Sequence, residues 1–454
     1  DILGDDLHDW EPYDLKTVII GDTFTNAINR DAAKGFPFKG LKDDWVWGDL
    51  DEPVLSKELV DDIQRMIANM DNYNIPPLNI ASTALKDEII TKKKSDEAMI
   101  RIFFGGNTSF LILCRAYLGK LMNIFVKHRH RLFAKIGMNA IGAELHKMVS
   151  DMFKKVMGVE LTAELLHIPC WVDGDFSKYD KMLLVLKFAI HVLWLLVKDT
   201  NFFRNQPTQL NRVRLILTAL QEYIVIIGED IFIMRDKMPS GVWATALINC
   251  ICEMIIEVLM FYFLLYVKRG EVLACDFVVR GRYVWNVDVF EVLAIANYGD
   301  DNIKCVAQIY WPLYGHENIM KFSQWLHMAM TPARKHETEI KLKPITEILF
   351  LKRVFTWNSH LNRLVGALDV DSIAKMLAFS DTKNVEEWRY AVIMTARREI
   401  AFHGLALYDR FRGLFKITET WEETLEEIDR NEWKFVPEVQ VPIYEIIFDD
   451  LTIS

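Results

Sequence analysis

Cysteine is scarce in this sequence, and its six cysteines do not have the spacing of a metal site. The tightest pair, Cys250 and Cys252, is separated by one residue, which is too close for a zinc knuckle. Because the cysteines lie within apolar runs, we expect reduced thiols in the core of a cytosolic protein.

The sequence also has no excess of positive charge. Its formal net charge is −10, which argues against a protein that coats nucleic acid without specificity. A local basic channel is compatible with this value, because the field inside a cleft depends on where the charges lie. With 454 residues, 51% of them hydrophobic, the chain is long enough for two or three subdomains and apolar enough to pack them.

No signal peptide opens the chain, and because it begins with Asp1 we expect it to come from a longer precursor. The apolar run 245–267 is long enough to cross a bilayer, but Asn249, Glu253 and Glu257 interrupt it at four-residue intervals. These positions lie on one stripe of a helix, and carboxylates are costly in the middle of a membrane. We therefore predict a buried helix with one polar edge facing a site, and no transmembrane segment.

Residues 297–302 carry the strongest local signal. Gly299 and Asp300 separate two short apolar runs, which predicts a hairpin with a two-residue type II′ turn. Asp300 would lie at the tip and Asp301 would begin the returning strand. Two adjacent carboxylates repel each other unless a cation lies between them. A cation site and a solvated acidic turn are equally compatible with these residues alone.

Two further segments carry polar residues that could bind a metal ion or a substrate. Asp175 ends a predicted strand, where it could bind a metal ion, and Asp180 could reach a substrate hydroxyl. Ser240 precedes the helix of residues 245–267, and Thr245 and Asn249 lie on one face of it because four residues separate them. The alternative is a helix cap at Ser240 and a hydrogen-bonded core amide at Asn249.

Three basic clusters are candidates for phosphate contacts. Residues 92–94 and Arg101 indicate either a solvated loop or a wall facing a polyphosphate, which needs several cations on one side. Residues 127–131 indicate either a nucleic-acid contact or an exposed helix face. Lys352 and Arg353 interrupt an alternating pattern, which indicates either an edge strand or a contact with backbone phosphates.

Five segments occur in the order Asp175-x4-Asp180, Pro239-Ser240-Gly241-x3-Thr245-x3-Asn249, Tyr298-Gly299-Asp300-Asp301, Thr331-Pro332-Ala333-x-Lys335 and Phe350-Leu351-Lys352-Arg353. In order and spacing they resemble motifs A to E of the RNA-dependent RNA polymerases of picornavirus-like positive-strand RNA viruses. Residues 86–101 look like motif F, and Gly35-x-Pro37 looks like motif G.

Some positions depart from the family pattern. Ile90 stands where motif F usually has an arginine, and Ala32-Ala33 stand where motif G commonly has Thr-Ser. Residues 268–290 are longer than in picornaviruses and predict an extra strand pair with a turn at 280–282. This length, together with Asn302, makes dicistrovirus-, iflavirus- and marnavirus-like polymerases a better match.

The resemblance implies an α+β fold, a closed right hand with fingers, a palm whose antiparallel sheet is flanked by helices, and a helical thumb. The fingers would comprise residues 1–169 and 200–237, and the thumb residues 356–454. The palm would comprise residues 170–199, with motif A, and 238–355, with motifs B to E. Such a protein replicates a viral genome by adding ribonucleotides to an RNA 3′ end.

The resemblance also implies roles for single residues. Asp175, Asp300 and Asp301 would hold Mg²⁺, for which Mn²⁺ can substitute, in a two-metal phosphoryl transfer, and Lys335 would be catalytic as the proton donor to pyrophosphate. The nucleotide-binding residues would be Lys92, Lys94, Arg101, Asp180, Ser240, Thr245 and Asn249. The RNA- and primer-binding residues would be Gly35, Pro37, Lys86, Ser240, Gly241, Lys352 and Arg353.

The implied partners are an RNA template and primer, ribonucleoside triphosphates, a viral protein primer and the viral replication complex. The implied location is the host cytoplasm, at membrane-associated replication complexes. Two alternatives have to be weighed. A reverse transcriptase would need an aromatic steric gate near the position of Asp180, and a non-catalytic RNA-binding scaffold of the same fold has no need of Asp175, Asp300 and Lys335 together.

Overall fold

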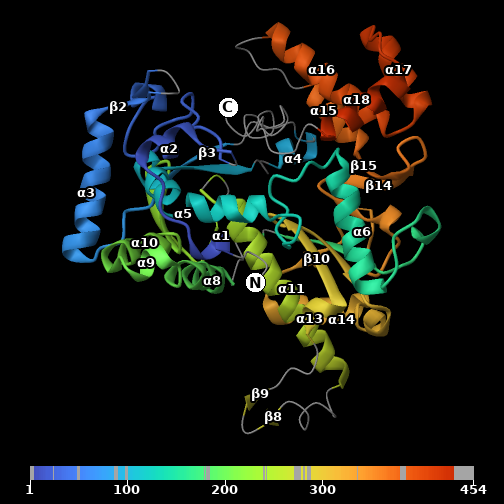
Figure 1. Cartoon of the computed structure of the whole chain (residues 1–454), viewed down its shortest axis with the longest axis horizontal. Helices are drawn as coiled ribbons and strands as arrows, with labels where there is room; N and C mark the ends of the chain where they lie inside the picture. Colours follow the sequence, from blue (N-terminus) through green and yellow to red (C-terminus); the bar gives the residue numbers. More distant parts are fainter. Residues whose placement is uncertain are drawn as a thin grey trace. The chain divides into compact units, whose positions relative to one another are not determined.

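The computed structural model describes residues 5–23, 25–48, 52–85, 90, 92–97, 101–177, 179, 185–238, 241, 243–269, 278–279, 282–283, 288–334, 336–378 and 385–433. The chain forms two compact units. The first comprises residues 1–136, 178–255 and 441–454, and the second comprises residues 137–177 and 256–440. Figure 1 shows the helices and strands of both.

The first unit contains a mixed sheet with the strand order β4-β3-β6-β7. β3 (Ile80–Leu85) pairs antiparallel with β4 (Ile102–Gly106) and parallel with β6 (Glu222–Ile227), which pairs antiparallel with β7 (Asp230–Arg235). Among its helices, α10 (Pro207–Ala219) packs against α3 (Lys57–Tyr73), α5 (Thr108–Lys127) and α8 (Leu186–Lys198). Asn107 caps α5, because its side chain accepts hydrogen bonds from the backbone of Ser109 and Phe110.

The second unit contains an antiparallel sheet with the strand order β10-β11-β5-β12. β10 (Leu293–Tyr298) and β11 (Asp301–Val306) form the predicted hairpin, with Tyr298 opposite Asp301. Of the two central turn residues only Gly299 has a positive φ, +68°, as a type II′ turn requires. β5 (Trp171–Phe176) lies between β11 and β12 (Met330–Thr331).

Helix α6 (Ala143–Met157) covers one face of this second sheet (Figure 1). Trp171, Ile303 and Cys305 alternate along their strands toward this face and pack with α6 in one buried core. Lys304 points to the opposite face, where it pairs with Glu257 of α11 (Thr245–Arg269). The predicted boundary at residue 169 assigns α6 to the fingers, whereas in the structure it packs on the sheet that carries Asp175.

After this sheet the chain forms a three-stranded sheet of β13 (Leu349–Phe350), β14 (Arg353–Asn358) and β15 (Arg363–Leu368). Among the described residues that follow are the helices α15 (Val370–Ala378), α16 (Val385–Ala401), α17 (Leu405–Phe415) and α18 (Trp421–Trp433). The alternating pattern around Lys352 is not one edge strand, so this one of the two alternatives does not hold. Leu351 and Lys352 have φ of +54° and +57° and form the turn between β13 and β14.

The predicted extra strand pair within residues 268–290 is confirmed. β8 (Val278–Val279) pairs antiparallel with β9 (Arg282–Tyr283), and Val279 lies opposite Arg282. The residues between these two strands, which include part of the predicted turn, lie outside the described residues.

Two helices of the described part are long and apolar enough to cross a membrane, by length and composition alone. They are residues 108–127 and 245–265, and 67% of the apolar window of each is buried inside the protein. Glu253 and Glu257 are completely buried in the second of them. The prediction of a buried helix with a polar edge is therefore confirmed for α11. The sequence analysis did not identify α5 as a second helix of this length and hydropathy.

Candidate active site

Three of the predicted carboxylates meet at one end of the sheet in the second unit. Asn302 of β11 lies opposite Gly174 of β5, so the antiparallel register, continued by one residue, places Asp301 opposite Asp175. Residues directly opposite each other in an antiparallel pair project from the same face. Asp300 is the next residue, at the tip of the turn. Residues 126 positions apart in sequence are thus neighbours, as the hairpin and strand predictions require.

The surrounding protein and the neighbouring acids both change the ionisation of Asp301. Its pKa is raised to about 7, first because the surrounding protein removes hydration and then because the charges of Asp300 and Asp175 disfavour ionisation. The positive charge of Lys352 acts in the opposite direction. As a whole residue, Asp301 is exposed at the protein surface.

The three carboxylates are suitable ligands for a divalent cation, but their side chains are not close enough together to hold one as they stand. Within the described ranges, no group of three or more His, Cys, Asp or Glu side chains is close enough to hold an ion as it stands. Carboxylates that repel each other are expected to stay apart until a cation draws them together. Hard cations such as Mg²⁺ prefer carboxylate oxygens, so the residues present fit that group.

The raised pKa of Asp301 predicts a pH-dependent stability in the absence of divalent cations. Between pH 3.8 and about 7 the folded state keeps a proton that the unfolded chain has released. This contribution is fully present below pH 3.8 and is lost as the pH rises through 7. Because Asp301 is exposed as a whole residue, we discount the effect for solvent screening to about 1 kcal/mol.

The measurement is urea unfolding of wild type and Asp301→Asn in EDTA across this pH range. Wild type should lose about 1 kcal/mol more than the variant between mildly acidic and mildly alkaline solution. Parallel stability curves for the two proteins would show that Asp301 has an ordinary pKa.

A buried ion pair supports the end of β5 that carries Asp175. Asp173 lies two residues before Asp175, forms an ion pair with Lys343 (2.7 Å) and accepts a hydrogen bond from the backbone of Leu349 (2.8 Å). The Lys343 ammonium also contacts a carboxylate oxygen of Glu337 (2.9 Å). Sequence reasoning missed this contact, although the alternation of Asp173 with Asp175 was a signal that both project from one face.

The segment between Thr331 and Lys343 is anchored on β5 at both ends. Thr331 pairs with Asp175, and its hydroxyl donates to the Asp175 carbonyl (3.3 Å). The backbone of Lys343 exchanges two hydrogen bonds with Trp171. The predicted proton donor Lys335 belongs to this segment and lies outside the described residues.

The turn between β13 and β14 separates the roles of Lys352 and Arg353. Lys352 is exposed and close enough to Asp301 to affect its pKa. The guanidinium of Arg353 is buried, forms two hydrogen bonds to Glu399 (2.7 and 2.6 Å) and donates to the carbonyl of Gly366 (2.8 Å). The prediction that Arg353 contacts the primer therefore has to be corrected, because its charge is used to hold β14 to α16.

In the first unit, Asn249 has a buried acceptor that could receive a ligand hydroxyl. Its side chain is 7% exposed, and its Oδ1 has no hydrogen-bond partner in the part of the chain that the structure describes. Tyr179 donates to its backbone carbonyl (3.1 Å), and Thr245 lies one helical turn earlier. A buried acceptor without a partner is costly, which disfavours the alternative of a satisfied core amide.

Two predicted RNA-binding glycines allow loops to approach β4 closely. Gly35 has φ +78°, and a Cβ there would lie 2.2 Å from a backbone oxygen of β4. Gly241 has φ +97°, and a Cβ there would lie 2.4 Å from the ring of Phe103. The backbone of Phe38 donates to Gly35, which closes the bend predicted at Gly35 and Pro37.

The basic clusters of the first unit are partly described. Lys92 and Arg101 are exposed. Lys127 and His128 both contact Asp6, at 2.6 and 2.7 Å.

The predicted site residues outside the described positions are Lys86, Asp180, Ser240 and Lys335, together with the side chain of Lys94.

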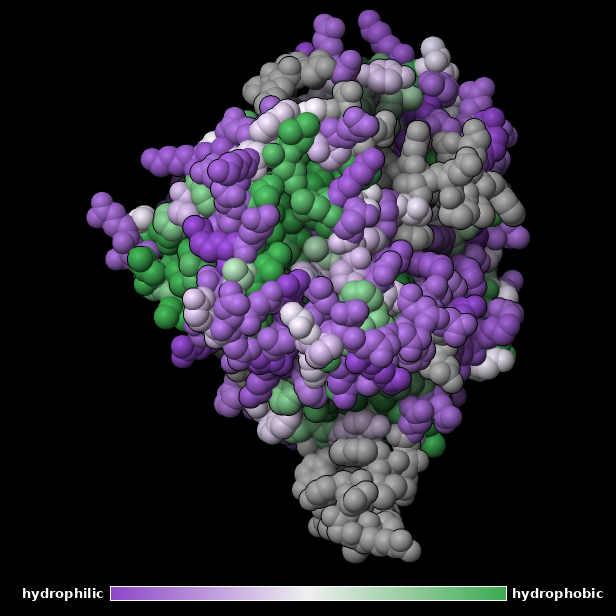
Figure 2. Space-filling view, turned by 60° about the vertical axis from the view of Figure 1, so that its left-hand side comes forward, coloured by the Kyte–Doolittle hydropathy of each residue, from purple (hydrophilic) through white to green (hydrophobic). Residues whose placement is uncertain are grey.

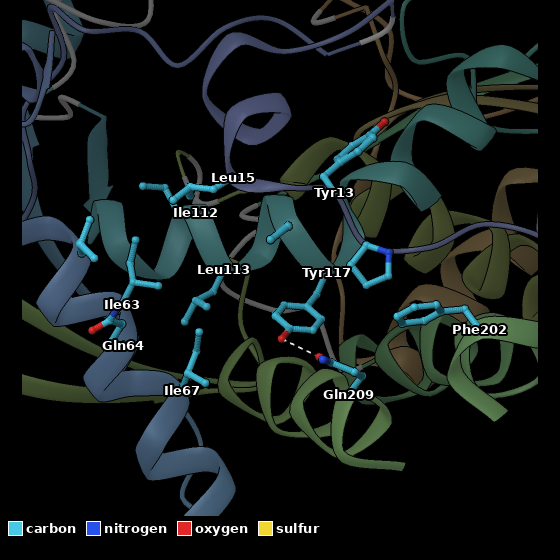
Figure 3. A pocket seen from close by; sticks show the side chains of 13 residues that line it. Tyr13, Leu15, Ile63, Gln64, Ile67, Ile112, Leu113, Tyr117, Phe202 and Gln209 are labelled. Carbon is cyan, nitrogen blue, oxygen red and sulfur yellow. Dashed lines mark hydrogen bonds between the residues drawn. The ribbon is translucent and has the colours of Figure 1, made fainter. Parts of the chain in front are cut away.

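A cavity of about 420 Å³ in the first unit does not have the chemistry of a triphosphate site (Figure 3). Apolar side chains such as Ile63, Leu113 and Phe202 line it. Tyr117 and Gln209 also line it, and the Tyr117 hydroxyl donates a hydrogen bond to the side-chain oxygen of Gln209 (2.8 Å). A triphosphate needs cations around its oxygens, and none of the lining residues is charged. On the molecular face drawn in Figure 2, apolar side chains likewise gather in one strip between hydrophilic ones.

Comparisons with known proteins agree with the motif order. The sequence profile of the family described as "Viral RNA-dependent RNA polymerase" matches residues 7–418. The chain is similar to the replicase polyproteins of Drosophila C virus (strain EB), 24% identical over 411 residues, and Acute bee paralysis virus (strain Rothamsted), 26% over 403 residues. It is 25% identical over 422 residues to the genome polyprotein of Human hepatitis A virus genotype IA (isolate HAS-15).

These alignments cover 86%, 86% and 88% of this chain, but only 22%, 20% and 18% of the three polyproteins. The chain therefore spans about a fifth of the length of the curated relatives it matches. Among solved structures, "Sicinivirus 3Dpol RNA dependent RNA polymerase" aligns with a TM-score of 0.65 at 15% identity, over 100% of this chain and 84% of that chain. At this identity the likeness shows a shared fold.

Proposed function

The chain belongs to the viral RNA-dependent RNA polymerase family, and from this membership we propose that it adds ribonucleotides to an RNA 3′ end as directed by an RNA template. The observation that carries the proposal is the meeting of Asp175, Asp300 and Asp301 at one end of the sheet. Asp175 and Asp300 would hold two Mg²⁺ ions, or Mn²⁺ in their place, with Asp301 assisting. When bound, these ions supply activation of the primer hydroxyl and neutralisation of the departing pyrophosphate.

Two lysines would complete the chemistry around the carboxylates. Lys352 would hold the primer terminus, and the effect of its positive charge on the pKa of Asp301 supports this role. Lys335 would give a proton to the leaving pyrophosphate. Its support is indirect: the segment that contains it is tied to β5 at Thr331 and Lys343.

We propose that Asn249 reads the ribose 2′-hydroxyl, together with Asp180 and with Ser240 and Thr245 behind them. A buried acceptor that only this hydroxyl satisfies disfavours a deoxynucleotide. Replacing Asn249 by alanine should therefore reduce the preference for UTP over dTTP by roughly tenfold. The measurement is the kcat/KM of each nucleotide on poly(A) with an oligo(U) primer. Unchanged discrimination in Asn249→Ala would remove Asn249 from the ribose-reading set, and the exposed amide variant Asn205→Ala is the control.

The decisive test of the function is primer extension by the purified wild-type chain with Mg²⁺, comparing UTP with dTTP. Efficient use of UTP and exclusion of dTTP is the expected result. Equal use of both would indicate a reverse transcriptase, and RNA binding without any extension would indicate a non-catalytic scaffold.

We extend the proposal to a set of partners, which follow from the family and from the replicase and genome polyproteins that the chain resembles. They are an RNA template and primer, ribonucleoside triphosphates, a viral protein primer and a replication complex. The reaction would take place in the host cytoplasm, at membrane-associated replication complexes.

A further inference from the structure

The first unit carries an apolar edge strand. β7 is the last strand in the order β4-β3-β6-β7, so among the described residues no strand pairs with its outer edge. Its central side chains are unusually exposed, with Ile231 at 70%, Phe232 at 46% and Ile233 at 59%. A free, apolar strand edge is a ready template for pairing with another strand.

The outer edge of β7 has a defined set of backbone groups. Ile227 lies opposite Asp230 across a two-residue turn, and the backbone of Asp236 donates to Gln221. Even-numbered residues of β7 therefore direct their N–H and C=O groups toward β6. Because this direction alternates along an antiparallel strand, Ile231 and Ile233 direct theirs toward the free edge.

We propose that β7 pairs antiparallel with β7 of a second copy of this chain, across a twofold axis at Phe232. Only residues with outward backbone groups can exchange hydrogen bonds, and this register sets Ile231 opposite Ile233 of the second copy. The phenylalanines then face each other as a non-hydrogen-bonded pair, where side chains are closest. The isoleucines of both copies form one apolar cluster on the other face.

Charge complementarity supports a second copy as the occupant and selects this register. Glu229 lies in the turn before β7, and in this register it is opposite Arg235 of the second copy. The twofold axis repeats this contact, so it occurs once at each end of the paired strands. The guanidinium of Arg235 is exposed and already contacts Glu222 (2.6 Å), so it would lie between two carboxylates. A twofold axis at Ile233 would instead set Asp230 opposite Asp236 of the second copy, and like charges directly opposite are destabilising.

The pairing buries little more than two strand edges, so we expect a weak dimer with a dissociation constant on the order of 10 µM. Sedimentation velocity of the full chain over a concentration series measures it. Ile233→Lys should raise the dissociation constant roughly tenfold or more, because lysine on an edge strand opposes pairing. Ile309→Lys is the control, since Ile309 is also an exposed isoleucine, at 78% against 59% for Ile233, and lies outside β7.

A charge swap tests the register itself. Glu229→Arg and Arg235→Glu should each weaken the dimer, and the double variant should restore it, because the two positions face each other between copies. Primer extension by each variant reports whether it is folded. A wild type that stays monomeric at about 100 µM, which is well above the expected dissociation constant, would overturn the proposal. So would a dimer that Ile233→Lys leaves intact, or a double variant no better than the single ones.

Discussion

Replacing Asp300 by asparagine is expected to lower the rate of nucleotide addition by roughly 10³-fold or more. Asparagine keeps the size of the side chain at the tip of the turn but removes the negative charge that would hold a divalent cation. Asp300 is exposed and the turn needs its special backbone conformation at Gly299 only, so the hairpin should form as before. Single-turnover primer extension measures the effect.

A matched control separates loss of the metal ligand from loss of one surface charge. Asp371 is an exposed aspartate in the first turn of α15, and Asp371→Asn should keep close to wild-type activity. Asp300→Asn should bind RNA normally and be slightly more stable than wild type without metal, because one of several repelling carboxylates is gone. Retention of more than about a tenth of the activity would contradict the assignment, since a metal ligand supplies more than tenfold. Simultaneous loss of RNA binding would point to a structural role.

The acidic hairpin could be predicted because its signals are local. A type II′ turn needs a positive φ at its first central position, which glycine adopts freely. The whole signal lies within residues 297–302. The meeting of Asp175 with this hairpin is a long-range pairing, and only the order of the motifs indicated it. The resemblance therefore supplied the part of the site that turn chemistry could not.

Two contacts could not be predicted because the partner lies at long sequence distance. Arg353 looks like a phosphate contact until Glu399, 46 residues later, is seen to neutralise it. Glu257 lies on the predicted polar stripe of α11, but it is buried against Lys304 of β11. The chain reversal at Leu351 and Lys352 has a different, local cause. Neither residue is a glycine or an asparagine, so the sequence does not indicate a turn there, and one edge strand was among the alternatives.

The buried pair of Arg353 and Glu399 leads to the largest stability effect that we expect. Glu399→Ala leaves the Arg353 guanidinium buried, with the carbonyl of Gly366 as its remaining hydrogen-bond partner among the described residues. The substitution should cost about 3–5 kcal/mol of unfolding free energy. Urea unfolding in the presence of EDTA measures it. The exposed pair of Lys147 and Asp151 in α6 is the control, because Asp151→Ala should change stability by about 0.5 kcal/mol or less.

A double variant shows whether the charge pair or the packing matters for the site. Arg353→Met with Glu399→Leu fills the same space without charge, and such replacements are often neutral or stabilising, so most of the loss should be recovered. Lys352 would then still stand at the turn beside Asp301, and primer extension should remain near wild type. If the double variant is stable but inactive, Arg353 acts on the RNA after all. If Glu399→Ala costs less than about 1 kcal/mol, the guanidinium is solvated and not buried.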